Sequence, residues 1–447
     1  MEGLGTEEKQ DVGKSLQDVI AFKPAVEEFS HVDYESAPGF LQEYTRNGIT
    51  IGVSKSLDEI AAIRPLWDQM RKRESSNIPD TDYNKYVSII KSMDGKAEPF
   101  IMYLKKDDTL LAMVIGRLEV QPLHLRLGYL TLIRPRLKCL TIIYGGIMGK
   151  PDESLCLTMI SELRAQMKAQ QADVIFLHYL KTDTTFYRAV KSIPCYLRRQ
   201  VKTDKHWRMA VPDTIDKFYS AHSRGHRHNL RRAISRFEHD YDGDIRYVNY
   251  TSEEHVTDFL KTAAHISEKT YQYALNAGLV NDERTRERIK ADAANGWFRG
   301  HIAFAGNKPC AFQLGLHYKN IYYMVNRGFD PAFKSYNPGL VLFLKVLEGL
   351  CEDPSIESVD FYFGDAEYKN RYGTECWQEA NICIFAPKIY PMFINALQIT
   401  TLSMNAGLKY IVNKIGLTDR IKRQWRNLLS AKTLVRKNRY NRKTFEC

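Results

Sequence analysis

The chain has 447 residues, 44% of them hydrophobic and 11% aromatic, which is enough for two or three folded cores and excludes a disordered chain. The net charge of +11 is concentrated in residues 414–443, with eleven Lys and Arg against the single acid Asp419, and in residues 223–236, with five Arg and no acid. The rest is slightly acidic, which argues against a general nucleic-acid-binding protein.

The eight cysteines are scattered without a CxxC pair, so the sequence predicts neither a zinc site nor a disulfide framework. The opening residues lack the basic and then apolar order of a secretory signal, and no stretch stays apolar for the length of a bilayer span. We therefore expect a cytoplasmic protein without a metal. Residues 1–45 are polar and aperiodic and form a poorly defined N-terminal segment.

From residue 46 a pattern appears that is repeated later. Strand-like runs at 99–104 and 109–118 flank the turn "KKDD", and two more runs follow at 125–133 and 137–146. Residues 151–171 have apolar side chains at helical spacing behind Pro151, and 173–180 return as a buried strand. A helical lead-in, "SLDEIAAIRPLWDQMRKRE", precedes these strands.

The second copy has the same order. Strands are expected at 300–305, 310–318 and 320–328, a helix at 337–353 and a closing strand at 359–364, after a long basic helix over 213–240. The sequence thus predicts an α+β protein of two repeats, each a mixed, mostly antiparallel sheet flanked by helices. We place the first domain at 46–211, the second at 212–388 and a helical, basic tail at 389–447. The alternative to a duplication is that two ordinary α/β segments are similar by chance.

The arginine-rich helix, the β-meander, "NPGLVLFLKVLEGL" and "VDFYFGDAEYKNRYG" together resemble the CelD-like branch of GNAT-fold acyltransferases, which is associated with cellulose and exopolysaccharide biosynthesis. That branch is similar to the FemAB peptidyltransferases, which are also tandem GNAT folds. The resemblance covers 213–385 well and 56–211 only as architecture. It implies that acyl transfer takes place in the second repeat, with the first as a degenerate partner that shapes the acceptor cleft.

The stretch after the closing strand is crowded with ionisable groups, as acyl transfer requires a base for the nucleophile and an acid for the leaving thiolate. The resemblance makes Asp365 or Glu367 the candidate base and Tyr368 the candidate acid. Substrate binding is assigned to Tyr362, Lys369 and Arg371, the latter two for a phosphate or a sugar acid. The alternative is a solvated strand exit with a buried Tyr and an ion pair.

The donor is expected at the start of the second central helix, where backbone N–H groups favour anions. Lys334, Ser335, Asn337 and Gly339 are the candidate cofactor-binding residues for acetyl-CoA or another acyl-CoA. The usual glycine spacing of GNAT enzymes is missing, so an aminoacyl-tRNA donor or an ordinary capped helix remains open. In the first copy, "GGIMGK" lacks the spacing of a P-loop.

Three histidines and several arginines share the basic helix. Arg224 and Arg231 are candidate contacts for an anionic substrate, and a solvated helix face is the equal alternative. His222 and His226 lie one turn apart, but the surrounding arginines would repel a cation, so metal binding is not expected.

The C-terminal segment combines apolar residues at helical spacing with the basic tail, which suits peripheral binding to the inner face of an anionic membrane. Packing on the second domain and RNA binding are the alternatives. The resulting hypothesis is an N-acyltransferase that moves an acyl group from coenzyme A to an amine, on an amino sugar or a lipid-linked saccharide of polysaccharide biosynthesis. The alternatives are a FemAB-like transferase that uses aminoacyl-tRNA and a non-catalytic GNAT-fold scaffold.

Overall fold

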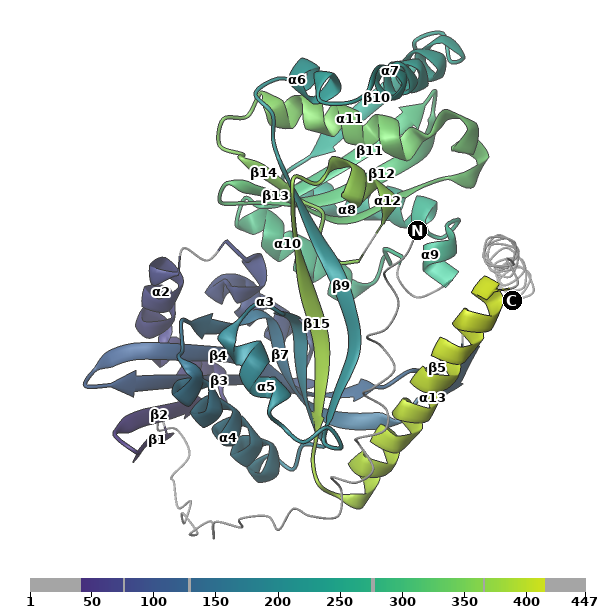
Figure 1. Ribbon diagram of the computed structural model, residues 1–447. Coiled ribbons are helices and arrows are strands. Elements are labelled where there is room, and N and C mark those ends of the chain that lie inside the picture. Colours follow the sequence, from purple (N-terminus) through teal and green to yellow (C-terminus); the bar gives the residue numbers. More distant parts are fainter. Residues whose placement is uncertain (1–41, 75–76, 128–129, 275–277, 365, 415–447) are drawn as a thin grey trace, which may run out of the picture. The chain divides into compact units, whose positions relative to one another are not determined.

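The computed structural model describes residues 42–74, 77–127, 130–274, 278–364 and 366–414, in which one arrangement of elements occurs twice (Figure 1). We call 42–210 the first repeat. Its elements are β1 (Gln42–Arg46), β2 (Ile49–Ser54), α1 (Leu57–Ala62), α2 (Arg64–Arg73), η1 (Pro79–Thr81), α3 (Tyr83–Ser92), β3 (Ala97–Lys106), β4 (Thr109–Pro122), β5 (Leu125–Leu127), β6 (Leu130–Ile133), β7 (Arg136–Gly149), α4 (Glu153–Ala169), β8 (Val174–Lys181), α5 (Thr185–Lys191) and β9 (Arg198–Ala210).

The second repeat, 215–385, follows the same order and is succeeded by one long helix. Its elements are α6 (Ile215–Ser220), α7 (Arg224–His239), β10 (Ile245–Tyr250), η2 (Glu253–His255), α8 (Val256–Ser267), α9 (Tyr271–Ala274), α10 (Glu283–Ala294), β11 (Phe298–Ala305), β12 (Lys308–Tyr318), β13 (Ile321–Phe329), η3 (Pro331–Tyr336), α11 (Pro338–Cys351), β14 (Ser358–Asp360), α12 (Glu367–Tyr372) and β15 (Glu375–Phe385), with α13 (Ile389–Lys414) last.

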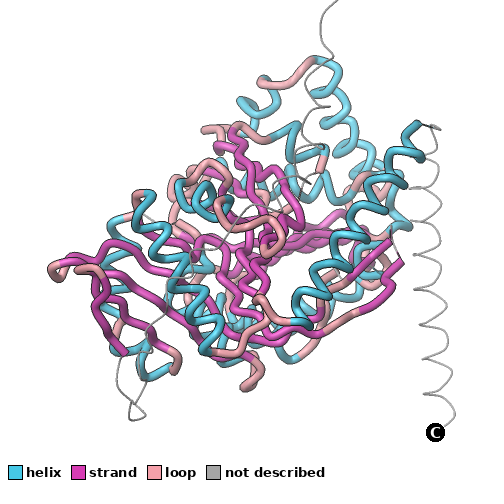
Figure 2. Tube along the Cα trace, turned by 60° about the horizontal axis from the view of Figure 1, so that its bottom comes forward, coloured by secondary structure: helices cyan, strands magenta, loops and turns pink. Residues whose placement is uncertain are grey.

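The strands of both repeats join one 13-stranded sheet in the order β1-β2-β3-β4-β7-β8-β15-β9-β14-β13-β12-β11-β10, while β5 and β6 form a separate ribbon. Each repeat contributes an antiparallel meander that ends in one parallel pair, β7 with β8 in the first and β13 with β14 in the second. Figure 2 shows the strands of this sheet in magenta between the cyan helices.

The last strand of each repeat lies in the other repeat's half of the sheet. Strand β9 pairs antiparallel with β14 of the second repeat, and β15 pairs antiparallel with β8 of the first. The two exchanged strands also pair with each other along most of their length, and Figure 1 shows them side by side. Each repeat therefore completes its sheet only with a strand from its partner.

Helices cover both faces of the sheet in each repeat, as apolar stripes on helices require. In the first repeat, α4 and α5 bury Met159, Leu163 and Val190 on one face, and α2 and α3 bury Trp67 and Tyr86 on the other. In the second repeat, α6, α7 and α11 cover one face, and α8 and α10 cover the other. Helix α4 begins at the N-cap Asp152, whose side chain accepts a hydrogen bond from Leu155 N–H.

Helices α2 and α3 of the first repeat also contact the second repeat directly. Nζ of Lys85 lies 2.6 Å from Oδ1 of Asp292, and both side chains are about nine-tenths buried, with exposures of 8% and 12%. The Asp82 carboxylate accepts hydrogen bonds from Arg71 and from the Tyr318 hydroxyl, which also contact each other. Buried polar contacts thus accompany the strand exchange in joining the repeats.

The predicted α+β class and the tandem arrangement are confirmed. Three local predictions are wrong. The closing strand expected over 359–364 ends at Asp360, because β14 has only three residues. The run 125–133 is a hairpin of two short strands, and the expected helix over 213–240 is split into α6 and α7, because Ser223 caps a new helix. The expected domain boundary, between 211 and 212, lies between β9 and α6. The basic tail beyond Lys414 and most of the 1–45 segment lie outside the described residues.

Candidate functional site

Strands β7 and β8 pair over four residues and then part. The register runs from Cys139 opposite Val174 to Ile142 opposite Leu177, and beyond this point the strands are not paired. A cleft of about 620 Å³ lies at the divergence, lined by both strands, by the loop before α4 and by the first turn of α5. A volume of this size is that of a small-molecule site.

The β7 side of the cleft is a bulge. Val114 of β4 lies opposite Ile147, and Gly116 lies opposite Ile142, so residues 143–146 of β7 face the single residue Ile115. Gly145 has φ +71°, a left-handed conformation that favours glycine. Because a bulge releases backbone groups from the ladder, this segment can present N–H donors to a ligand carbonyl.

Cationic and aromatic side chains from the exchanged strands also line the cleft. Trp377 of β15 lies between the Lys181 Nζ, 4.7 Å from its ring centroid, and the Arg208 guanidinium, at 5.2 Å. His206 stacks on the same indole with ring centroids 4.4 Å apart. The second repeat thus supplies part of the wall of a cleft in the first.

His206 lies at the centre of a buried ionic network. Its Nδ1 is 3.0 Å from Oε2 of Glu379 and its Nε2 is 2.7 Å from Oδ1 of Asp360, and the three side chains are 0–2% exposed. Burial alone would lower the pKa of His206, but the hydrogen bonds and charges of the two carboxylates raise it to about 9. A doubly protonated imidazolium therefore satisfies both acids.

The network extends to two side chains of the cleft. The Tyr144 hydroxyl donates to Oε1 of Glu379 at 3.2 Å, and Arg208 Nη2 lies 3.3 Å from Oδ2 of Asp360. Burial, and then the Glu379 charge, raises the pKa of Tyr144, so its phenol stays protonated. Both cleft residues are held in position by the charges around His206.

His178 of β8 is the titratable group at the point of divergence. Burial, and then the charge of Arg117, lowers its pKa to about 4, so the imidazole is neutral near pH 7. A neutral imidazole can accept a proton from a nucleophile. Phe363, from the exit of β14, lies against it and stacks on Tyr179 with ring centroids 3.8 Å apart.

The start of α4 is partly occupied by acids. Glu74 Oε1 accepts the Gly149 backbone N–H at 2.8 Å, and Asp152 caps the helix with Glu153 behind it. These carboxylates use the N–H groups that an anionic ligand would take. Three residues before α4 line the cleft, at 149–151, and Lys150 is the basic one.

The corresponding gap in the second repeat is filled. Strands β13 and β14 pair only from Ile321 opposite Ser358 to Tyr323 opposite Asp360. The Arg327 guanidinium then lies 4.7 Å from the Tyr368 ring centroid and donates to the Gly339 carbonyl at 2.8 Å. Arg327 of β13 thus lies between the start of α11 and the Tyr368 ring of α12.

Of the catalytic residues predicted from the sequence, Tyr368 is the one that contacts Arg327. Tyr368 is largely buried, and burial raises its pKa. Glu367 is exposed and forms an ion pair with Arg371 on α12. Asp365 lies outside the described residues. These assignments stay predictions.

Two of the predicted substrate-binding residues take part in the architecture of the strand exit. Lys369 is 5% exposed and its ammonium donates to the carbonyls of Tyr362 and Phe363. Tyr362 has φ +57° and donates its hydroxyl to Asp80 of the first repeat at 3.1 Å. Tyr179, within β8 and beyond its pairing with β7, has φ +47°, so in both repeats a tyrosine in a strained left-handed conformation follows the end of the parallel pairing.

The predicted cofactor-binding residues share one loop. Lys334 and Ser335 of η3 and Asn337, between η3 and α11, are exposed, and Gly339 is buried in the first turn of α11. Asn337 has φ +50° and no acid lies in that first turn. The loop is therefore more favourable to an anion than the start of α4, but no residue of it lines the cleft of the first repeat.

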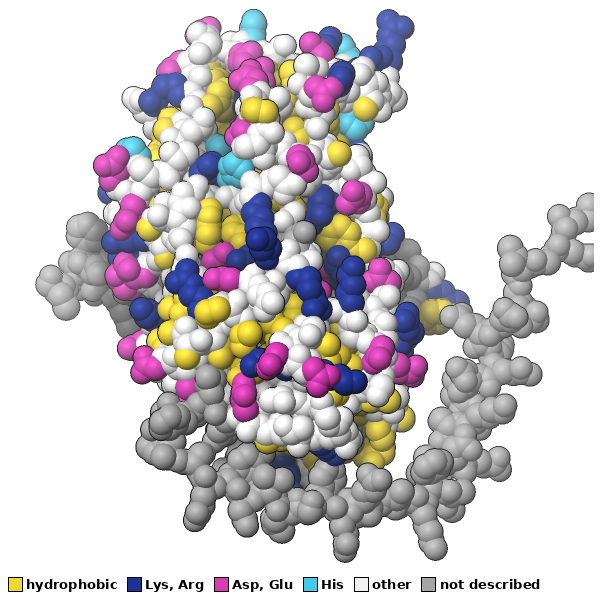
Figure 3. All heavy atoms as spheres, turned by 90° about the vertical axis from the view of Figure 1, so that its left-hand side faces the viewer, with side chains coloured by type: hydrophobic (Ala, Val, Ile, Leu, Met, Phe, Trp, Pro, Cys, Tyr) yellow, Lys and Arg dark blue, Asp and Glu magenta, His cyan; other side chains and the backbone are white. Residues whose placement is uncertain are grey.

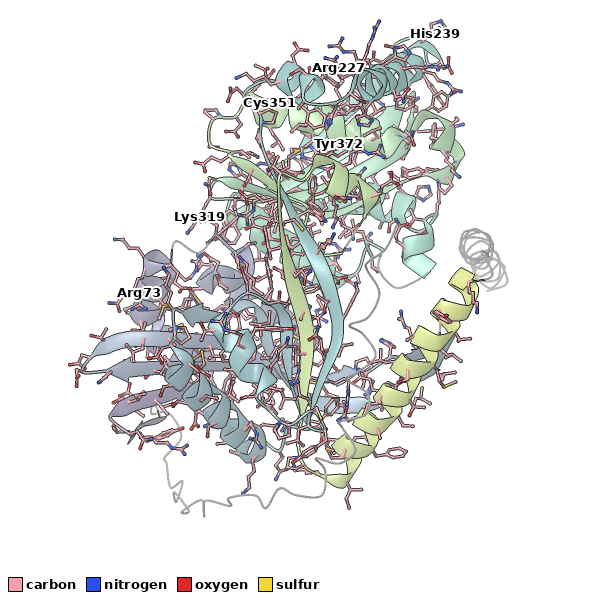
Figure 4. All side chains as sticks on the ribbon, viewed as in Figure 1. Arg73, Arg227, His239, Lys319, Cys351 and Tyr372 are labelled. Carbon is pink, nitrogen blue, oxygen red and sulfur yellow. The ribbon has the colours of Figure 1, made fainter. Side chains whose placement is uncertain are left out.

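Arg224 and Arg231 lie on the exposed face of α7, and Arg231 is 3.5 Å from Asp216. Figure 4 shows the neighbouring Arg227 and His239 on the same outer helix. His222 and His226 pack edge to face at 5.1 Å beside Tyr372. Figure 3, which views the left-hand side of Figure 1, shows further Lys and Arg side chains gathered across the middle of that face.

Sequence reasoning missed Tyr144, His178, His206, Asp360 and Glu379. The glycines at 145, 146 and 149 are the sequence signal for the bulge and for the loop before α4. In the sequence they were compared only with the spacing of a P-loop, which they do not have. His206 stands in "TDKHWRMA", where alternation suggests an ordinary strand.

The comparisons with known proteins agree with this architecture. Residues 224–370, less than half of the chain, match a family model described as an acetyltransferase (GNAT) domain. This match supports the prediction of a GNAT-type acyltransferase. No curated protein gives a significant match.

Three solved structures share similarity over most of their length. They are FemX (10% identity, 70% of this chain and 93% of that chain, TM-score 0.47), a tandem GNAT protein from the clavulanic acid biosynthesis pathway (8%, 76% and 99%, 0.46) and the C-terminal domain of a putative lysylphosphatidylglycerol synthetase from Agrobacterium fabrum (10%, 75% and 96%, 0.43).

Proposed function

We propose that the protein transfers an acyl group from a thioester to an amine, and that the thioester binds in the cleft between β7 and β8. One observation carries this proposal. In the described sheet of the first repeat, paired strands part between β7 and β8, and a strand bulge, the neutral His178 and the fixed side chains of Tyr144 and Arg208 meet at that point. The corresponding gap of the second repeat holds Arg327.

The chain's residues have distinct roles in this reaction. The bulge at 143–146 directs backbone N–H groups at the carbonyl oxygen, where negative charge develops during attack. His178 accepts the proton that the amine loses as the C–N bond forms, and its imidazolium returns that proton to the sulfur as the C–S bond breaks, so that the thiol leaves. Arg208 and Lys181 attract the anionic part of a donor or acceptor, with Trp377 between them.

The donor is acetyl-CoA or another acyl-CoA, and the acceptor is an amine on an amino sugar or a saccharide intermediate of polysaccharide biosynthesis. The resemblance of the second repeat to the CelD-like branch supports this choice of acceptor, and the GNAT domain match supports the donor class.

Calorimetry on the full chain with acetyl-CoA tests the donor and its place. Thr185 lies at the cleft where α5 begins, so Thr185→Trp is expected to weaken binding at least tenfold by filling the space. Leu157→Trp, on the outer face of α4, is the matched control and is expected to bind like the wild type. If Asn337→Ala weakens binding and Thr185→Trp does not, the donor lies at α11, as the sequence predicts.

One observation favours a second candidate, transfer from an aminoacyl-tRNA. Glu74 holds the Gly149 N–H at the start of α4, where a coenzyme A pyrophosphate would need free donors. If no coenzyme A species binds in the calorimeter but aminoacyl-tRNA supports transfer, this candidate replaces the first.

A further inference from the structure

Helix α13 packs apolar and polar residues together against the protein, with Ile394 in its core, and has large apolar residues on its exposed face. Asn395, Gln398 and Thr401 are 1%, 4% and 8% exposed, whereas Ile389 and Phe393 are 93% and 58% exposed. Met404 and Leu408 continue the exposed apolar face toward the end of the helix. A helix on the surface of a globular protein normally has polar residues on its exposed face.

Side-chain hydrogen bonds fix this orientation. Asn395 donates to the Tyr196 carbonyl at 2.7 Å and accepts from Arg199 at 3.2 Å. Asn405 donates to the Arg126 carbonyl at 2.6 Å, and the Tyr390 hydroxyl donates to the Arg136 carbonyl at 3.1 Å. These contacts hold the apolar face of the helix outward. A rotation of the helix that buried this face would break them.

The β5–β6 ribbon lies beside α13 (Figures 1 and 2). Leu132 and Ile133 of β6 are 47% and 45% exposed. Arg126, Arg134 and Arg136 are exposed around them. We call the exposed side chains of α13 and of this ribbon the apolar-basic face.

The two segments that form the face contain no acid. Residues 120–138 have four Lys or Arg and no Asp or Glu, and residues 386–414 have three Lys and no Asp or Glu. Large apolar side chains inside a rim of cations match the composition of an anionic bilayer surface, whose headgroups are negative and whose interior is apolar.

We propose that the apolar-basic face docks on an anionic phospholipid bilayer, with Ile389 and Phe393 inserted below the headgroups and the arginines of the β5–β6 ribbon among the phosphates. None of the described helices is long and apolar enough to cross a bilayer, so the contact is interfacial. A nucleic acid would leave the apolar residues without a partner, because its outer surface is charged.

Sedimentation of the full chain with vesicles of phosphatidylcholine and phosphatidylglycerol tests the proposal. The double variant Ile389→Glu/Phe393→Glu is expected to lower the vesicle-bound fraction at least tenfold, since both changes place charge where apolar side chains insert. Leu157→Glu changes a comparably exposed leucine on α4 and is expected to bind like the wild type. Equal binding of the wild type and the double variant would overturn the proposal.

Two further measurements separate this face from other surfaces. At about 1 M salt, where charges are screened within roughly 3 Å, part of the wild-type binding should persist and the double variant should lose it. Fluorescence of a Phe393→Trp variant should be quenched by brominated acyl chains, and that of Leu157→Trp should not. If the double variant instead loses tRNA binding or self-association while vesicle binding is unchanged, the face serves RNA or a second copy of the chain and the proposal falls.

Discussion

Nε2 of His206 lies 2.7 Å from Oδ1 of Asp360, and this contact joins a strand of the first repeat to one of the second. Glu379 holds the other ring nitrogen from β15 at 3.0 Å. The two carboxylates are buried, and the positive charge and hydrogen bonds of His206 offset the cost of burying them at the centre of the sheet.

Replacing His206 with Gln should destabilise the protein by roughly 3–5 kcal/mol, because two buried carboxylates then lose their cation. Denaturant unfolding followed by circular dichroism measures this change. Lys202→Gln, which removes a largely exposed partner of Asp204 on the same strand, is the control and should cost less than about 1 kcal/mol. Similar costs for both variants would mean that His206 is not charged in the folded protein.

Stability should also fall in alkaline solution through His206. Its pKa in the folded protein, about 9, lies above the value of 6.5 for free histidine, so its stabilising contribution is complete below about pH 6.5 and is lost as pH rises through 9. The free energy of unfolding of the wild type should drop by roughly 2–3 kcal/mol more than that of His206→Gln between pH 6.5 and 9.5. Parallel profiles of the two proteins would contradict the assignment.

The buried pair of Lys85 and Asp292 should show strong coupling in a double-mutant cycle. Lys85→Met leaves an unpaired buried acid and should cost roughly 3–5 kcal/mol, whereas Lys85→Met combined with Asp292→Leu should restore most of that loss. Urea unfolding of the four proteins measures the coupling. Additive effects would show that the two side chains are solvated separately.

His178→Ala should reduce kcat by about 10²–10⁴ if His178 takes the proton from the amine. Because its pKa is lowered to about 4 by burial and by Arg117, the base should be lost only as pH falls through about 4, and no change of activity between pH 6 and 8 should arise from it. His301, also buried and also with a pKa lowered to about 4, lies in the second repeat and is the matched control. Steady-state rates per folded molecule should be unaffected by His301→Asn.

Tyr368→Phe separates the two possible sites of catalysis. With the reaction in the cleft of the first repeat, this variant should keep kcat within about threefold, because it removes only a hydroxyl beneath Arg327. A loss of 10² or more, with an unchanged thermal midpoint, would place proton transfer in the second repeat, as the sequence predicts.

Much of the fold could be predicted because its signals are local. The apolar spacing of α4 and α11, the capping residues and the alternating runs of the meanders each depend on neighbours within a few positions. The exchange of β9 and β15 could not be predicted in this way. Both strands suit either half of the sheet, and their partners are chosen by contacts between residues far apart in the chain.

The same limit explains the unpredicted part of the candidate site. The two carboxylates of His206 are 154 and 173 positions away, so no window of sequence contains the network. The GNAT-like strand exit at 359–373 was recognisable as a motif, but whether the gap beside it is open depends on the side chain of Arg327 on another strand. The residue type at position 327 does not predict where its side chain lies.

The exchange of β9 and β15 also determines when the protein can fold during synthesis. The first repeat cannot complete its sheet until residues 375–385 have left the ribosome. The edge of β8 therefore stays unpaired until nearly the whole chain has been synthesised. A gene fragment that encodes either repeat alone would yield an unpaired strand edge. Neither repeat is therefore an independent folding module, and the two can be inherited, recombined or engineered only as one unit.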